Sequence, residues 1–302
     1  MNAMLRPDEV DQTDSDAHLK VAGLADDAII KVSDFSAAYG DTIVLHDITF
    51  QVNRSEILVI AGDSGSGKTT LLQHMIGLAI PAKGRILIDG DDLSTTPPGT
   101  VRDKIMRKFG VSFQSGALFG SMNVLENVSL QLKQFAHLNG TMADMIALTK
   151  LQMVGLADSA QRMPAELSGG MQKRVGIARA MALDPMIIFM DEPSAGLDPI
   201  TSAEMDQLIL TLNKLLKTTF VIVSHELTSI FKIAHRVLLL STEKQTLIAE
   251  GEPNELRSHS NDAWVRAFFS GDIPSSKAVS PKGTSSTIGG HDLMPANGNT
   301  HH

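Results

Sequence analysis

The chain has 302 residues, 43% of them hydrophobic and 20% charged, which provides a core for one large domain or two modest ones and excludes disorder as the main state. Thirty-four acidic against 26 basic residues, with an aromatic content of only 4%, argue against a nucleic-acid-binding protein, which needs a basic surface and stacking rings. The absence of cysteine excludes disulfides, cysteine-ligated metal centres and a thiol nucleophile.

The first 27 residues form an acidic leader, in which seven acidic side chains stand against Arg6 and Lys20. Such a segment has little apolar surface to offset the entropy of ordering, so we predict that it is solvated and flexible. It has neither the basic region nor the apolar region of a secretory signal. Apolar runs elsewhere reach only strand length, far below the roughly 18 residues that span a bilayer, so any membrane association should be peripheral.

Two strand-like stretches, residues 29–35 and 42–52, are separated by turn residues and predict a small antiparallel sheet. A buried-type run at 57–60 then precedes a glycine-rich turn and a helix from about Lys68 to Leu78. This order is half of a βαβ unit, which is typical of an α/β protein with a parallel sheet. Residues 84–90, bounded by glycines, predict a further strand.

The middle of the chain predicts a helical insertion, because residues 122–165 carry Leu, Met and Ala at helical spacing and lack strand-like runs. Strand-like runs at 186–190 and 219–223 then flank a helix over about 201–217. We therefore expect the parallel sheet to resume after the insertion.

The final stretch, residues 270–302, is rich in Ser, Gly and Pro and predicts a flexible tail. A short apolar pair beside a proline interrupts its polar run at residues 291–295. Apolar clusters in disordered tails often order on binding, so this segment is a candidate docking point, with a passive solubilising tail as the alternative.

A phosphate-binding loop is predicted where the first buried strand meets its helix, because residues 62–69 read G-D-S-G-S-G-K-T. Glycines let successive backbone N–H groups turn toward phosphate oxygens, and the following helix directs its positive end at the same anion. The ammonium of Lys68 adds a full charge, and the hydroxyl of Thr69 is suited to magnesium.

A second acidic element ends the strand-like run at 186–190, where Asp191 and Glu192 follow in succession. Ligand-facing groups lie at the carboxyl ends of strands in such sheets, so Asp191 is the candidate magnesium ligand. The neighbouring Glu192 is placed to orient or activate the attacking water. Alone, this pair could merely begin a turn, and the phosphate loop is what favours the functional interpretation.

The chain resembles the ATPase subunits of ATP-binding cassette (ABC) transporters. The signature motif of that family stands about 20 residues before Asp191, as Leu167-Ser168-Gly169-Gly170-Met171. The resemblance covers roughly residues 28–252. It implies a RecA-like P-loop NTPase core with an N-terminal antiparallel β subdomain and an inserted α-helical subdomain, at about 115–168 within a 28–269 ATPase domain. It also implies that two copies sandwich two ATP molecules head to tail. Met171 departs from the family's usual glutamine.

The same resemblance assigns roles to single residues. Gln114 resembles the glutamine that contacts magnesium and senses the permease, and His225 resembles the switch histidine that hydrogen-bonds the γ-phosphate. Asp198 resembles the acid that couples the two ATP sites across the dimer, and Tyr39 resembles the aromatic residue that packs against adenine. The predicted catalytic residues are Glu192, His225, Gln114 and Lys68, and the predicted magnesium ligands are Thr69, Gln114 and Asp191. The predicted ATP contacts are Tyr39, Gly62, Asp63, Ser64, Gly65, Ser66, Gly67, Lys68, Thr69, Thr70, Ser168, Gly169, Gly170 and Asp198.

Within the family, residues 114–119 followed by Met122-Asn123-Val124 resemble the ATPases of Mla-type phospholipid transport, which maintains outer-membrane lipid asymmetry. This implies an integral permease, a STAS-domain cytoplasmic subunit, an MCE-domain periplasmic lipid-binding protein, and a location on the cytoplasmic face of a bacterial inner membrane. The alternatives are a small-solute importer of the amino-acid type and, less favoured, a non-transport ABC protein.

Overall fold

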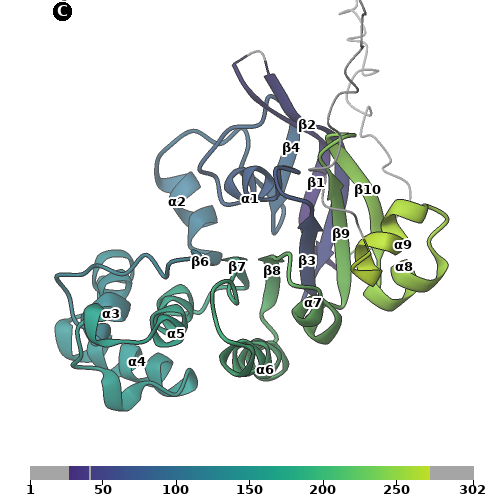
Figure 1. Cartoon of the computed structure of the whole chain (residues 1–302). Coiled ribbons are helices and arrows are strands. Elements are labelled where there is room, and N and C mark those ends of the chain that lie inside the picture. The colour runs from purple at the N-terminus through teal and green to yellow at the C-terminus, as the bar shows by residue number, and fades with distance from the viewer. Residues whose placement is uncertain (1–26, 41, 273–302) are drawn as a thin grey trace, which may run out of the picture.

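The computed structural model describes residues 27–40 and 42–272, and it contains two sheets and two hydrophobic cores (Figure 1). Nearly all of the predicted acidic leader and flexible tail, with the candidate docking segment at 291–295, lies outside the described residues. Among the residues described, no helix is both long and apolar enough to cross a membrane.

The smaller sheet has four strands in the order β2-β1-β4-β5. Its longest strands pair antiparallel, which confirms the predicted sheet, and their inward residues are fully buried. Together with helix α1 and one face of the larger sheet, it encloses one of the two cores. The bounds are β1 Ala28–Tyr39, β2 Thr42–Asn53, β4 Lys83–Ile88 and β5 Asp91–Asp92.

The larger sheet has six strands in the order β10-β9-β3-β8-β7-β6, parallel except for the edge strand β10. Strands β3 and β8 are buried at every residue, as expected for strands covered on both faces. Three neighbouring strands, β3, β8 and β7, end at the same edge. The bounds are β3 Ile57–Gly62, β6 Phe109–Ser112, β7 Ile187–Asp191, β8 Thr219–Val223, β9 Arg236–Ser241 and β10 Thr246–Gly251.

Helices pack on the other face of this sheet and enclose the second core. Figure 1 shows α3 to α5 grouped beyond β6, whereas α8 and α9 lie beside β9 and β10 at the opposite end of the sheet. The bounds are α1 Lys68–Met75, α2 Thr100–Met106, α3 Val124–Phe135, α4 Gly140–Met153, α5 Gly169–Ala180, α6 Pro199–Leu216, α7 Leu227–Ile233, α8 Pro253–His259 and α9 Ala263–Ser270. Short 3-10 turns cover 157–159 and 164–166.

Most predicted elements are confirmed, with small differences at their ends. Helix α1 ends three residues before the predicted Leu78, because Gly77 adopts a left-handed φ of +74° and turns the chain. Helix α3 begins at a capping box, in which Asn123 and Glu126 each accept from the other's backbone N–H. The sequence alone does not indicate strands β5, β6 and β10 or helices α2, α7, α8 and α9.

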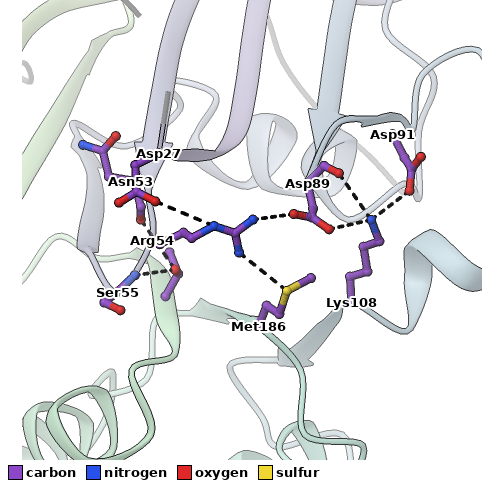
Figure 2. A network of polar contacts seen from close by, with 9 residues as sticks. Asp27, Asn53, Arg54, Ser55, Asp89, Asp91, Lys108 and Met186 are labelled. Carbon is purple, nitrogen blue, oxygen red and sulfur yellow. Dashed lines mark hydrogen bonds and ion pairs between the residues drawn. The ribbon is translucent and has the colours of Figure 1, made fainter. Parts of the chain in front are cut away.

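A network of charged side chains joins the two sheets at the edge opposite the phosphate loop (Figure 2). Arg54, after β2, lies 2.5 Å from Asp89, and Lys108, before β6, lies 2.8 Å from both Asp89 and Asp91. The hydrogen bond from Lys108 holds the pKa of Asp89 below its usual value. These contacts fix the turn after β4 against the base of the parallel sheet.

Candidate active site

A cavity of about 600 Å³ lies where β3, β8 and β7 end. Because carboxyl ends of neighbouring parallel strands meet at one edge, residues far apart in the sequence share its walls. Ten predicted site residues line it: Gly62, Asp63, Ser64, Gly65, Lys68, Thr69, Gln114, Asp191, Glu192 and His225. Three residues without a predicted role line it as well: Leu227, Phe268 and Gly271.

The phosphate loop has the backbone that its glycines predict. Gly65 and Gly67 adopt φ values of +85° and +89°, and a Cβ at Gly62 would lie 2.5 Å from the carbonyl oxygen of Leu240. Lys68 donates from Nζ to the carbonyls of Gly62 (2.9 Å) and Asp63 (2.8 Å), which leaves a third ammonium N–H for a ligand.

Burial lowers the pKa of Lys68, while the neighbouring carboxylates of Glu192, Asp63 and Asp191 act in the opposite direction. The neighbouring carboxylates therefore do not fully offset the loss of hydration of the Lys68 ammonium on folding. A phosphate group would supply the missing negative charge, because an anion beside a half-buried ammonium favours its charged form.

Asp191 and Glu192 stand at the end of β7 with buried oxygens that lack partners. Within the described part of the chain, Oδ1 of Asp191 and Oε2 of Glu192 make no hydrogen bond. Burial raises the pKa of Asp191, and the charge of Glu192 raises it further, against the influence of Lys68. Two adjacent buried carboxylates with oxygens that accept no hydrogen bond are energetically unfavourable unless a ligand binds them.

Glu192 also has a strained backbone, with a left-handed φ of +49° that non-glycine residues rarely adopt. Its N–H donates to the carbonyl of Val223 at the end of β8, and its Oε1 lies 2.7 Å from Nδ1 of His225. The Glu192 side chain is 13% exposed and that of His225 is 60% exposed, so the histidine reaches the carboxylate from the solvent side. Strain of this kind is concentrated at functional sites.

The donor set around Asp191 fits magnesium. Asp191 lines the same cavity as Thr69 and Gln114, and these residues carry a carboxylate, a hydroxyl and an amide oxygen. These are oxygen ligands, which Mg²⁺ prefers, and too few to satisfy it without water and phosphate. Asp191, Thr69 and Gln114 are therefore the residues that would hold the ion.

Sequence reasoning missed Lys173, a buried residue of α5. Its Nζ donates to the carbonyls of Glu192 (3.3 Å) and Ala195 (2.5 Å), and burial lowers its pKa. Lys173 therefore holds the loop that carries Glu192. Its position soon after the Leu167–Met171 motif was the available signal, since that helix had been assigned to the site.

Several predicted residues do not line the cavity. Ser168, Gly169 and Gly170 begin helix α5, where Oγ of Ser168 accepts from the N–H of Met171 at 3.3 Å. Asp198 caps α6, and hydrogen bonds from Thr201 hold its pKa below the usual value. Within one chain, these two helix starts are separate from the phosphate loop.

Tyr39, at the end of β1, is 56% exposed, and its hydroxyl lies 3.4 Å from Oε1 of Gln73 in α1. Its ring is open to a ligand but stands outside the cavity. The other predicted contacts that do not line the cavity are Ser66, Gly67 and Thr70, all at the start of α1.

Asp191→Asn is expected to stabilise the protein without nucleotide while abolishing its Mg²⁺ response. The raised pKa means that the charged form costs folding free energy above that pKa, and the cost disappears as the pH falls below it. At pH 7 we expect the variant to melt about 2–4 °C above the unchanged protein, which corresponds to a gain of about 1 kcal/mol in unfolding free energy for a domain of this size. The gain should shrink as the pH is lowered.

Calorimetry over a pH series measures this, with the exposed Asp158→Asn as matched control. A melting temperature for Asp191→Asn equal to or below that of the unchanged protein at pH 7 would contradict the strain that we assign to the carboxylate.

Comparisons with known proteins agree with this geometry. A family model described as ABC transporter matches residues 45–195. The ATP-binding protein MlaF of the intermembrane phospholipid transport system of Haemophilus influenzae is 37% identical over 244 residues, 81% of this chain and 91% of the relative. A probable ribonucleotide transport ATP-binding protein, mkl of Mycobacterium leprae, is 37% identical over 242 residues, 80% of this chain and 69% of the relative.

Solved structures give the same picture. The cbiO1 structure from Clostridium perfringens, part of an ABC transporter complex, has a TM-score of 0.71 and 29% identity over 77% of this chain and 92% of its own. The dimeric bacterial ABC transporter cassette MJ0796 has a TM-score of 0.67 and 32% identity over 74% of this chain and 98% of its own. A post-hydrolysis dimer of MJ0796 contains ADP and phosphate.

Proposed function

The chain belongs to the ABC transporter family as an ATPase subunit, and we propose that it powers phospholipid transport of the Mla type across a bacterial envelope. One observation carries the ATPase assignment. The phosphate loop, the unpaired Asp191 and the pair formed by Glu192 and His225 line a single cavity. The relatives named MlaF, matched over most of their length, favour the lipid cargo.

In the proposed chemistry, the loop's backbone N–H groups and Lys68 bind the β- and γ-phosphates of ATP. Glu192 orients a water molecule in line with the γ-phosphorus by accepting its hydrogen bond, and His225 donates a hydrogen bond to the γ-phosphate. The contact of 2.7 Å between Glu192 and His225 keeps both side chains on one side of the cavity. Mg²⁺, when bound, would neutralise charge that develops on the phosphates.

A second copy of the chain explains why some predicted ATP contacts lie outside the cavity of the phosphate loop. Ser168 and Gly169 are exposed at the start of α5, outside the cavity of the phosphate loop, whereas Gly170 is buried. An exposed helix start is what an anion site completed by a partner requires. The related MJ0796 cassette is dimeric. We propose that each chain supplies this helix start to the γ-phosphate bound by the other chain.

The permease docks, in this proposal, on an apolar cavity of about 460 Å³ between the sheet and the helical insertion. Phe113, Phe119 and Phe135 line it and are 38%, 51% and 49% exposed, which is unusual for rings on a soluble surface. Phe113 faces this cavity, whereas the next residue, Gln114, lines the phosphate cavity. Two adjacent residues therefore join the docking surface to the reacting centre.

The remaining partners are proposed from the resemblance. They are a STAS-domain cytoplasmic subunit and an MCE-domain periplasmic lipid-binding protein. We also propose, from the same resemblance, that the chain lies on the cytoplasmic face of the inner membrane. The mycobacterial relatives, described as probable ribonucleotide transport proteins at similar identity, make ribonucleotide the second candidate cargo.

Co-purification in mild detergent, with mass spectrometry of proteins and lipids, tests this function. We expect a permease and bound phospholipid with the unchanged chain. The double variant Phe119→Asp, Phe135→Asp should lose the permease, because two charges enter an apolar contact, but should keep ATP binding. A permease that carries no lipid and whose complex is stimulated by ribonucleotide would contradict phospholipid transport.

A further inference from the structure

Helix α9 reaches the phosphate cavity from the C-terminal end of the described chain. Phe268 and Gly271 line that cavity together with Leu227, and none of them belongs to the motifs that predict ATP hydrolysis. Leu227 comes two residues after His225 in the chain, and both line the same cavity as Glu192. Part of the wall of the cavity that contains the residues assigned to the attacking water is therefore apolar.

Helix α9 ends abruptly at this wall. Gly271 adopts a left-handed φ of +76°, and its N–H bonds back to the carbonyls of Ala267 and Phe268. A Cβ added at Gly271 would lie 3.9 Å from Cδ1 of Leu227. The end of α9 therefore lies against the start of α7.

Helix α7 begins two residues after His225, so its position sets where the histidine stands. Leu227 and Phe231 are four residues apart and share one face of α7. The Phe231 ring meets that of Phe269 edge to face at 6.0 Å, and the guanidinium of Arg257 lies 4.8 Å from the Phe231 ring centre. Both α8 and α9 thus hold this face.

The aromatic contacts continue through α9 to the cavity. Phe269 meets Phe268 edge to face at 5.2 Å, and Phe268 stacks on Trp264 at 5.7 Å. Elsewhere, α7 contacts α6 through Lys232, which lies 3.6 Å from Asp206 and donates to the carbonyl of Ala203. Loss of the aromatic contacts would leave this short helix without its support from α9.

We propose that the C-terminal helices α8 and α9 are part of the hydrolytic machinery, with Phe268 as a positioning residue that acts on α7 through Phe269, and through α7 keeps His225 in register with Glu192. Phe268 does not bind the transferred phosphate. It lines the cavity together with Leu227 and contacts Phe269, which packs on Phe231 of α7. The inference rests on the proposed role of His225 in ATP hydrolysis.

Steady-state hydrolysis by the full chain tests this inference with Phe268→Ala and Phe268→Leu. Misplacement of a catalytic group has large effects on rate, and we expect Phe268→Ala to lower kcat about tenfold with KM nearly unchanged, measured well below the melting temperature of the variant. Phe268→Leu, which keeps an apolar side chain, should recover most of the rate. Leu215→Ala, exposed at the end of α6, is the matched control.

Combination with His225→Ala separates positioning from a general structural effect. If Phe268 acts through the histidine, Phe268→Ala should cause no further loss in the His225→Ala background. Equal losses in both backgrounds, or full activity of Phe268→Ala, would overturn the inference alone. Full activity of His225→Ala would instead overturn the role proposed for His225, and this inference with it. Should Phe268→Ala fail to fold, Arg257→Gln, changed at an exposed side chain, must show the same dependence on His225.

Discussion

Glu192→Gln is expected to lower ATP hydrolysis about 10²- to 10³-fold while ATP still binds, because removal of a major transition-state group has effects of this size. The amide keeps the shape of the side chain but accepts the water's hydrogen bond more weakly. It also changes the contact of 2.7 Å with His225. ATP should consequently remain bound and unhydrolysed.

The measurement is phosphate release together with direct ATP binding. Glu243→Gln, exposed in the turn between β9 and β10, is the matched control and should hydrolyse ATP normally. Near-normal turnover by Glu192→Gln would remove this residue from the reaction.

Lys68→Ala should weaken nucleotide binding and hydrolysis together, in contrast with Glu192→Gln. The ammonium has two bonds to the loop carbonyls and one N–H free for phosphate, so its removal takes away both loop support and charge. We expect hydrolysis to fall by at least about 10²-fold. Calorimetry should show weaker ATP affinity, and Lys83→Ala, exposed on β4, should leave affinity unchanged.

If Lys68→Ala binds ATP as tightly and hydrolyses it as fast as the unchanged chain, Lys68 has no part in the phosphate site. Wild-type affinity combined with slow hydrolysis would assign Lys68 to the chemical step alone.

The sequence predicts the segments that meet in the candidate phosphate site because the determinants of each segment are local. The loop at 62–69 comprises eight consecutive residues between a buried strand and a helix, and Asp191 with Glu192 follows another buried strand. Strand pairing then brings these segments to one edge of the sheet, as expected for parallel strands.

The rest depends on contacts between distant segments. Lys173 reaches Glu192 across 19 residues, and the cavity wall at Phe268 depends on how α9 packs beside α7. No local pattern encodes either contact. Strand β6 has only four residues and follows a charged helix, so its alternation is too short to recognise.

The roles of Ser168 and Asp198 could be predicted only by resemblance. In one chain, both side chains cap helices, and neither lines the cavity. In the function proposed here, a second copy of the chain supplies their surroundings.

The measurement that tests the composite ATP site most directly is light scattering by Glu192→Gln with Mg²⁺ and ATP. The account predicts twice the mass of one chain with ATP, one chain without it, and one chain again when Ser168→Arg is added, because the arginine would occupy the space of the partner's γ-phosphate. A dimer that forms equally well with Ser168→Arg, or the absence of any ATP-dependent dimer, would contradict a site completed by the second chain.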